Sequence, residues 1–120
     1  MICVLLESPY QGDLDLNTRY ARAALADSLS RGEAPIASHM LYTQPGVLDD
    51  SVPAERRRGI AAGHAWMDRV DNVVAYADLG VSEGMWQGIA RAVQEGKSVE
   101  YRHLGGEWAA PPGCNCERDD

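Results

Sequence analysis

The stretch Ile2-Cys3-Val4-Leu5-Leu6-Glu7-Ser8-Pro9-Tyr10-Gln11-Gly12 decides the fold. It opens with a continuous apolar run, which the turn residues Ser8 and Pro9 bring to an end. Such a run between turn residues is typical of a strand buried on both faces, as in the centre of a parallel sheet. A secretory signal peptide is a poorer interpretation, because no basic region precedes the run and Glu7 follows it at once. We therefore predict a central strand over residues 2–6.

Strand-like and helix-like segments alternate along the rest of the chain. Further strands are predicted over residues 34–38, 72–77 and 98–102, and helices over residues 17–31, 53–70 and 82–96. The helical segments carry apolar residues at helical spacing, with Pro53 in a first turn and Gly32 as a stop. This order predicts an α/β fold, a Rossmann-like (flavodoxin-like) parallel sheet of about four to five strands with helices on both faces. The domain is expected to span residues 1–104, with residues 105–120 as a loose C-terminal tail.

Composition restricts the possible partners. The chain has 120 residues and a formal net charge of -7, which suits one globular domain and repels the phosphates of duplex nucleic acid. No apolar run is long enough to cross a bilayer, so no membrane partner is expected. Three cysteines without framework spacing favour a reducing compartment, and we expect a cytoplasmic protein, in the host cytoplasm if a phage encodes it.

The C-terminal cysteines were the one candidate for a metal site. Cys114 and Cys116 are separated by one residue, and His103 is a distant third ligand. Because a second ligand pair is missing, an unstructured tail is the better interpretation. We expect neither a metal nor another cofactor.

Parallel sheets bind ligands beyond the carboxyl ends of their strands, where this sequence concentrates its unusual residues. After the first strand come Ser8, Pro9, Tyr10 and Gly12, followed by Asp13. A hydroxyl, an aromatic ring and a glycine there can bind a phosphate or sugar, stack on a base and let the backbone approach closely. The alternative is a tight turn fixed by proline and glycine.

The second candidate loop lies between a strand and a helix. Asp78 ends the strand, and Ser82-Glu83-Gly84-Met85 starts the helix, whose first N–H groups are free to hold an anion. Alternatively, Ser82 is only a helix cap. Both loops are expected to meet at the carboxyl ends of the strands, which favours a binding site there.

The order Ser8-Pro9-Tyr10-x-Gly12, a strand ending in Asp78, and Ser82-x-Gly84 at a helix start resembles the nucleoside 2-deoxyribosyltransferase superfamily. That superfamily includes deoxynucleoside 5′-monophosphate N-glycosidases, and the resemblance covers about residues 1–104. It implies that Ser8 and Gly12 lie at the phosphate or sugar and Tyr10 at the base or sugar. It also places Ser82 at a phosphate, which favours a phosphorylated ligand.

One position departs from the family. The resemblance implies a nucleophilic glutamate six residues after Ser82, and this chain has Gly88 there. If the chain is an enzyme, Glu83, Asp78 or Glu7 has to replace that carboxylate. Since glycine inside a helix costs roughly 1 kcal/mol relative to alanine, Gly88 indicates that room is needed, for a ligand or a neighbouring helix.

Other candidates carry less weight. His39 and Tyr42 follow the second strand, in a long loop predicted over residues 38–50. The basic cluster Arg56-Arg57-Arg58 can reach an anion in a neighbouring subunit or form a solvated face, and Arg19 and Arg22 are weaker candidates. The three residues predicted to lie in the core or a subunit interface are Trp66, Met67 and Trp86. The family commonly shares sites between subunits, so a homo-oligomer is expected.

Three functions stay open at this point. The favoured one is binding and sequestration of a nucleotide-derived small molecule without turnover, as phage proteins do with nucleotide immune signals. The second is an N-glycosidase or deoxyribosyltransferase acting on a (deoxy)nucleoside monophosphate. The third is an interaction protein with a vestigial pocket.

Overall fold

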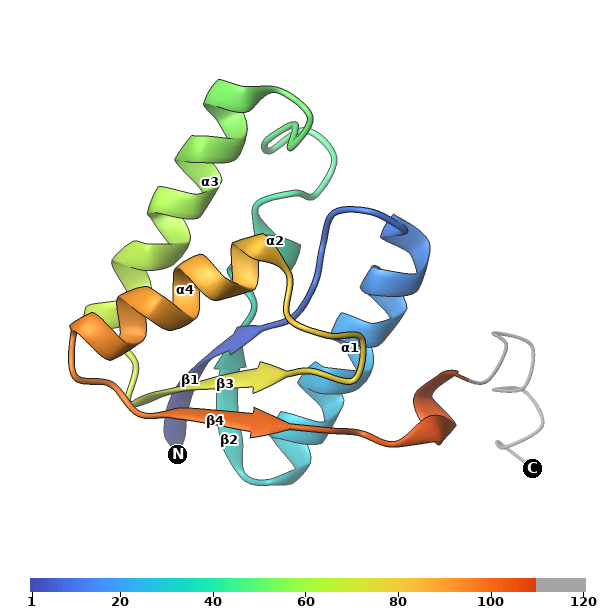
Figure 1. Ribbon diagram of the computed structural model, residues 1–120, viewed down its shortest axis with the longest axis vertical. Helices are drawn as coiled ribbons and strands as arrows, with labels where there is room; N and C mark the ends of the chain where they lie inside the picture. The colour runs from blue at the N-terminus through green and yellow to red at the C-terminus, as the bar shows by residue number, and fades with distance from the viewer. Residues whose placement is uncertain (110–120) are drawn as a thin grey trace.

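The computed structural model describes residues 1–109 and consists of one parallel sheet between two layers of helices (Figure 1). Its four strands are ordered β2-β1-β3-β4 and all pair in parallel. Their bounds are Ile2–Glu7 for β1, Glu33–Ile36 for β2, Asn72–Tyr76 for β3 and Val99–Arg102 for β4. The prediction of a Rossmann-like α/β fold, with the first strand in the interior of the sheet, is confirmed.

The helices lie on both faces of the sheet, as expected. Helix α1 (Leu14–Ser30) covers one face, while α3 (Pro53–Ala65) and α4 (Glu83–Gln94) lie on the other (Figure 1). Of the 13 residues of α3, only Gly63 is buried. The short elements are α2 (Ser38–Leu41) and the 3₁₀ helices η1 (Trp66–Asp68) and η2 (Gly106–Ala109).

Alternation along β1 divides its side chains between the two faces. Val4 and Leu6 pack with Tyr20 of α1, whereas Leu5 packs with Met67 on the opposite face. By the same alternation, Glu7 shares the face of Leu5 and points toward α3 and α4. A carboxyl group thus ends a strand whose centre is fully buried.

A buried ion pair joins the start of β2 to the end of β4. Arg102, whose side chain is 5% exposed, donates from Nη2 to Oε2 of Glu33 at 2.6 Å and from Nη1 to Oε1 at 2.9 Å. It also donates to the hydroxyl of Tyr76 at 3.0 Å. The hydrogen bonds from Arg102 outweigh desolvation and lower the pKa of Glu33 to about 2. The pair ties together two strands at opposite edges of the sheet.

Several predicted boundaries were wrong for local reasons. Helix α1 begins at Leu14, three residues before the prediction, because the Asp13 carboxylate caps it by accepting from Leu16 N–H at 3.1 Å. The predicted helix over 53–70 ends at Ala65 and continues as η1. The predicted loop over 38–50 contains helix α2.

The segment expected to be a loose tail is partly ordered. Residues 106–109 form η2, and the Trp108 ring packs edge-on against Tyr20 with ring centroids 4.7 Å apart. The packed part of the chain therefore extends beyond Leu104. The remainder, including Cys114 and Cys116, lies outside the described residues.

Aromatic residues also differ from expectation. Met67 is fully buried, as predicted, but Trp66 and Trp86 are exposed and belong to no core cluster of residues 1–109. Whether they form a subunit interface stays a prediction. None of the helices described is both long and apolar enough to span a bilayer.

Candidate functional site

A cavity of about 140 Å³ lies beyond the carboxyl end of β1, walled by α2, α3 and the start of α4. It brings together ten residues that the sequence singled out, namely Glu7, Ser8, Tyr10, His39, Tyr42, Arg56, Ser82, Glu83, Gly84 and Met85. A wider hollow of about 920 Å³ adjoins it and shares Tyr10, Gln11 and Asp50. Since ligand pockets are commonly about 300–1,000 Å³, the inner cavity alone is too small for a nucleotide, and a nucleotide bound there would extend into the hollow.

Three other candidates from the sequence lie outside this cavity. Pro9 is buried beside it, and Gly12 lines the adjoining hollow, where its φ of 106° requires glycine. Gly88 is buried behind the cavity wall. Pro9 and Gly88 therefore lie behind the cavity surface, whereas Gly12 belongs to the hollow beside it.

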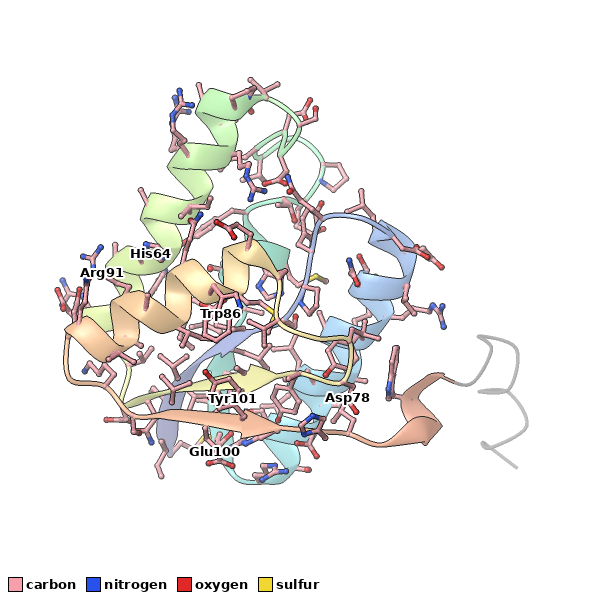
Figure 2. The ribbon with its side chains drawn as sticks, viewed as in Figure 1. His64, Asp78, Trp86, Arg91, Glu100 and Tyr101 are labelled. Carbon is pink, nitrogen blue, oxygen red and sulfur yellow. The ribbon has the colours of Figure 1, made fainter. Side chains whose placement is uncertain are left out.

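Asp78 serves the fold instead of the cavity. Its carboxylate accepts from the Tyr20 hydroxyl at 2.5 Å and from the backbone N–H groups of Leu104 and Gly105 at 2.8 and 3.0 Å. Figure 2 shows it beside the segment that leads to η2, whereas His64 lies at α3. With these partners the carboxylate ties β3 to α1 and to the C-terminal segment, and it is a poor replacement for a missing nucleophile.

Ser8 and His39 form a hydrogen-bonded pair at the base of the cavity. Ser8 Oγ and His39 Nε2 are 2.7 Å apart, and Ser8 is 4% exposed. Desolvation lowers the pKa of His39 to about 4, so the imidazole is neutral at physiological pH. A neutral imidazole can accept a proton from a ligand or from the serine hydroxyl.

The position of His39 depends on a glycine in α3. A Cβ on Gly63 would stand 2.5 Å from Oγ of Ser38, the first residue of α2. The absence of a side chain at Gly63 lets α2 pack directly against α3, and the Thr43 hydroxyl closes α2 by donating to His39 O at 2.6 Å. The histidine therefore lies on a packed helix and not in the long loop that the sequence predicts over residues 38–50.

Glu7 occupies the space that a side chain at position 88 would need. A Cβ on Gly88 would stand 2.3 Å from Oε2 and 2.8 Å from Cδ of Glu7. The carboxyl group of β1 is thus placed against α4 at the position where the resemblance implies a glutamate. Room at Gly88, predicted for a ligand or a neighbouring helix, is taken by this side chain.

The Glu7 carboxyl is poorly solvated and has no charged partner. Burial alone raises its pKa to about 8. Its oxygens accept no hydrogen bond from residues 1–109. Among the fully enclosed side-chain polar atoms of these residues, only Nε of Arg19 lacks a partner, so the Glu7 oxygens are not fully enclosed and open to the cavity. At neutral pH the group is mainly a carboxylic acid.

The start of α4 supplies hydrogen-bond donors to the cavity wall. Ser82 is the N-cap predicted from the sequence and accepts from Met85 N–H at 3.3 Å. The N–H groups of Glu83 and Gly84 belong to the first turn and have no acceptor within the helix. They can hold an acceptor or anion of a ligand.

Arg56 brings one positive charge to the cavity. It is held by Asp50 at 3.1 Å, and Gln11 donates to the same carboxylate at 3.0 Å. Arg57 and Arg58 are exposed, which agrees with a solvated face for those two. Arg56 and Asp50 thus belong to the cavity wall of their own chain. The expected sharing of a site between subunits stays a prediction.

Carboxyl groups outnumber cations in the lining. Glu7, Asp50, Glu55 and Glu83 face one arginine, which is already paired. A ligand with several phosphates would meet strong repulsion here, unlike one that is mostly uncharged. Within residues 1–109, no three His, Cys, Asp or Glu side chains are arranged to hold a metal ion.

The sequence had indications of the contacts it missed. Alternation along β1 places Glu7 on the side of α4, and Gly88 marks the place where α4 has room for it. The link from Gln11 to Asp50 and Arg56 joins two segments that are far apart in sequence, and no local pattern predicts it.

Residues 2–102 match the family described as a domain of unknown function, DUF7768. The chain belongs to this family. A comparison with curated proteins finds no match.

Among solved structures, this DUF7768 chain is similar to the CMP N-glycosidase BcmB of Clostridium botulinum. The identity is 14%, the TM-score is 0.49, and the match covers 97% of this chain and 80% of the other. A similarity of this size says nothing about the activity of the DUF7768 chain, which has to be argued from its own residues.

Proposed function

We propose that this protein binds a nucleotide-derived small molecule in the cavity and holds it without turnover. The observation that carries the proposal is the meeting, in one cavity, of the Ser8–His39 pair with the free N–H groups at the start of α4. Tyr10 and Tyr42 add aromatic rings to the lining, and the adjoining hollow offers space for the rest of such a molecule. The acidic lining favours a ligand with few phosphates.

The test is to incubate the full chain with nucleosides and with mono-, di- and cyclic nucleotides, then record the melting shift and recover the ligand. A ligand at 100 times its Kd should stabilise the fold by about 2.7 kcal/mol and return intact on chromatography. Ser8→Ala should weaken binding, whereas Ser30→Ala, a serine on the exposed end of α1, should not. If no compound in the panel shifts the melting temperature, the proposal is wrong.

The position of Glu7 favours a second candidate, an N-glycosidase acting on a (deoxy)nucleoside monophosphate. Its carboxyl lies where the family resemblance implies the nucleophile. The chemistry of the resembled family would then use a carboxylate from β1 in place of one from α4. Against this candidate stands the elevated pKa of Glu7, since a neutral acid is not a nucleophile.

This candidate makes a distinct prediction. Free base should appear with time during incubation with a deoxynucleoside monophosphate, and Glu7→Gln should abolish its release. Asp78→Asn should leave the release unchanged because Asp78 lies outside the cavity. An intact ligand after prolonged incubation would exclude the candidate.

A further inference from the structure

We propose that Glu7 recognises the nucleobase of the ligand as a neutral carboxylic acid, pairing with the ring nitrogen and the neighbouring exocyclic amino group of adenine or cytosine. This inference rests on the proposed nucleotide binding and names the class of base. It concerns a side chain whose carboxyl oxygens have no hydrogen-bond partner in residues 1–109 and that opens into the cavity.

The position of the acid is fixed by the fold. Glu7 is the last residue of β1 and pairs in register with Ala75 of β3. Its carboxyl rests against Gly88 of α4 and takes up the space that a side chain at position 88 would need. A group held between a central strand and a helix loses little conformational freedom when a ligand binds.

Burial favours the neutral form of Glu7, and the lining described offers no unpaired cation to oppose it. The ionisable groups of the cavity are His39 on α2, Asp50 before α3, Glu55, Arg56 and His64 on α3, and Glu83 on α4. The one arginine is bound to Asp50, and His39, whose pKa desolvation lowers, is neutral at physiological pH. The other carboxyl groups can only disfavour a further negative charge.

A neutral carboxylic acid has one donor and one acceptor side by side. Adenine and cytosine offer the complementary pair, a ring nitrogen that accepts and an amino group that donates, and a glutamine amide reads adenine in the same manner. Guanine presents two adjacent N–H donors on its Watson–Crick edge, which match an ionised carboxylate. Uracil and guanine can also pair an N–H and a neighbouring carbonyl oxygen with the neutral acid, but a carbonyl oxygen is a weaker acceptor than a ring nitrogen.

The dimensions of the site agree with a base at this position. The inner cavity of about 140 Å³ has room for a flat ring system and is walled by apolar surface from Tyr42, Ile60 and Met85. The larger hollow beside it leaves the sugar and any phosphate nearer to water. Placing the uncharged part of the ligand inward keeps a phosphate away from Glu7.

The experiment is calorimetric titration of the full chain with AMP, CMP, GMP and UMP at pH 7 and pH 9. AMP or CMP should bind best at pH 7, and its affinity should fall about tenfold by pH 9 as Glu7 ionises. Glu7→Gln, which reproduces the donor and acceptor of the neutral acid, should bind within about threefold of wild type at pH 7 and keep that affinity at pH 9. Glu7→Ala should bind at least fivefold more weakly, and Glu83→Gln should keep the pH dependence.

The outcomes separate the inference from the proposed function. Binding of AMP or CMP that is independent of pH, or equal losses in Glu7→Gln and Glu7→Ala, would overturn the role of Glu7 while leaving nucleotide binding intact. If GMP binds most tightly and its affinity rises toward pH 9, Glu7 acts as an ionised carboxylate, and the inference of a neutral acid is overturned. If none of the four nucleotides or their nucleosides binds, the inference fails, and the proposed function fails as well if the di- and cyclic nucleotides of the wider panel give no melting shift.

Discussion

Replacing Gly88 by alanine tests the contact on which the interpretation of Glu7 depends. The new Cβ would stand 2.3 Å from Oε2 of Glu7, so the carboxyl group has to leave its position. Alanine gains about 1 kcal/mol of helix propensity over glycine, whereas overpacking a buried site costs about 1–3 kcal/mol. We expect Gly88→Ala to be neutral or destabilising by up to about 2 kcal/mol.

The informative quantity is the coupling between the two positions. In a Glu7→Ala background the obstruction is gone, and Gly88→Ala should stabilise the protein by up to about 1 kcal/mol. The double-mutant cycle should therefore give an interaction energy of about 1–3 kcal/mol. Urea denaturation of the four variants at pH 7 measures it.

Gly84 provides the matched control, because it lies in the same helix and a Cβ there meets nothing within 4 Å. Gly84→Ala should be equally stabilising with and without Glu7. An additive cycle for Gly88 would refute the reasoning, since it would mean that Glu7 does not rest on α4. A coupled cycle for Gly84 would show that the effect is not local.

Further predictions concern stability and its dependence on pH. Arg102→Met leaves Glu33 without its cationic partner and should lower the free energy of unfolding by about 3–5 kcal/mol in urea denaturation. In the wild type, the stabilising effect of this pair, roughly 3 kcal/mol, should be lost as pH falls from 4.5 to about 2, and the variant should not show that loss. Asp78→Ala should cost about 1–3 kcal/mol from lost hydrogen bonds and leave ligand affinity unchanged in titration calorimetry, so weaker binding would contradict its placement. Because the folded pKa of Glu7 is raised, stability should fall as pH rises from 4.5 to about 8, by at most about 1.4 kcal/mol per pH unit, and Glu7→Gln should flatten that slope in melting curves. His39 has a lowered pKa, so its contribution is lost as pH falls from 6.5 to about 4, and His39→Gln should reduce that loss.

The fold was predictable because it follows from local patterns. The apolar run of β1, the glycine after α1 and the N-cap Ser82 each specify one element, and the alternation of elements then leaves a parallel sheet as the architecture. The start of α1 was predicted three residues late because the capping role of Asp13, directly before the helix, was not recognised. The short helix α2 was missed because its packing depends on Gly63, which is distant in sequence.

The candidate site was predictable only in outline. Two loops were expected to converge, and residues from both line one cavity. The sequence had no means of assigning Asp78, because its partners Leu104 and Gly105 come from a segment expected to be a loose tail. Nor does it indicate that Ser8 bonds to His39, since such a pair depends on the spacing between β1 and α2 in three dimensions.

The way α3 is attached has a consequence for how this family can diversify. Only its glycine at position 63 is buried, so α3 packs on α2 through its backbone at this residue. The side chains at its other positions are not buried in the core. The opposite wall, formed by β1 and α4, also holds the sheet together and tolerates little change. Substitutions along one helix can therefore alter which molecules enter the cavity at small cost in stability, and a variant library confined to α3 would sample ligand preference in proteins that still fold.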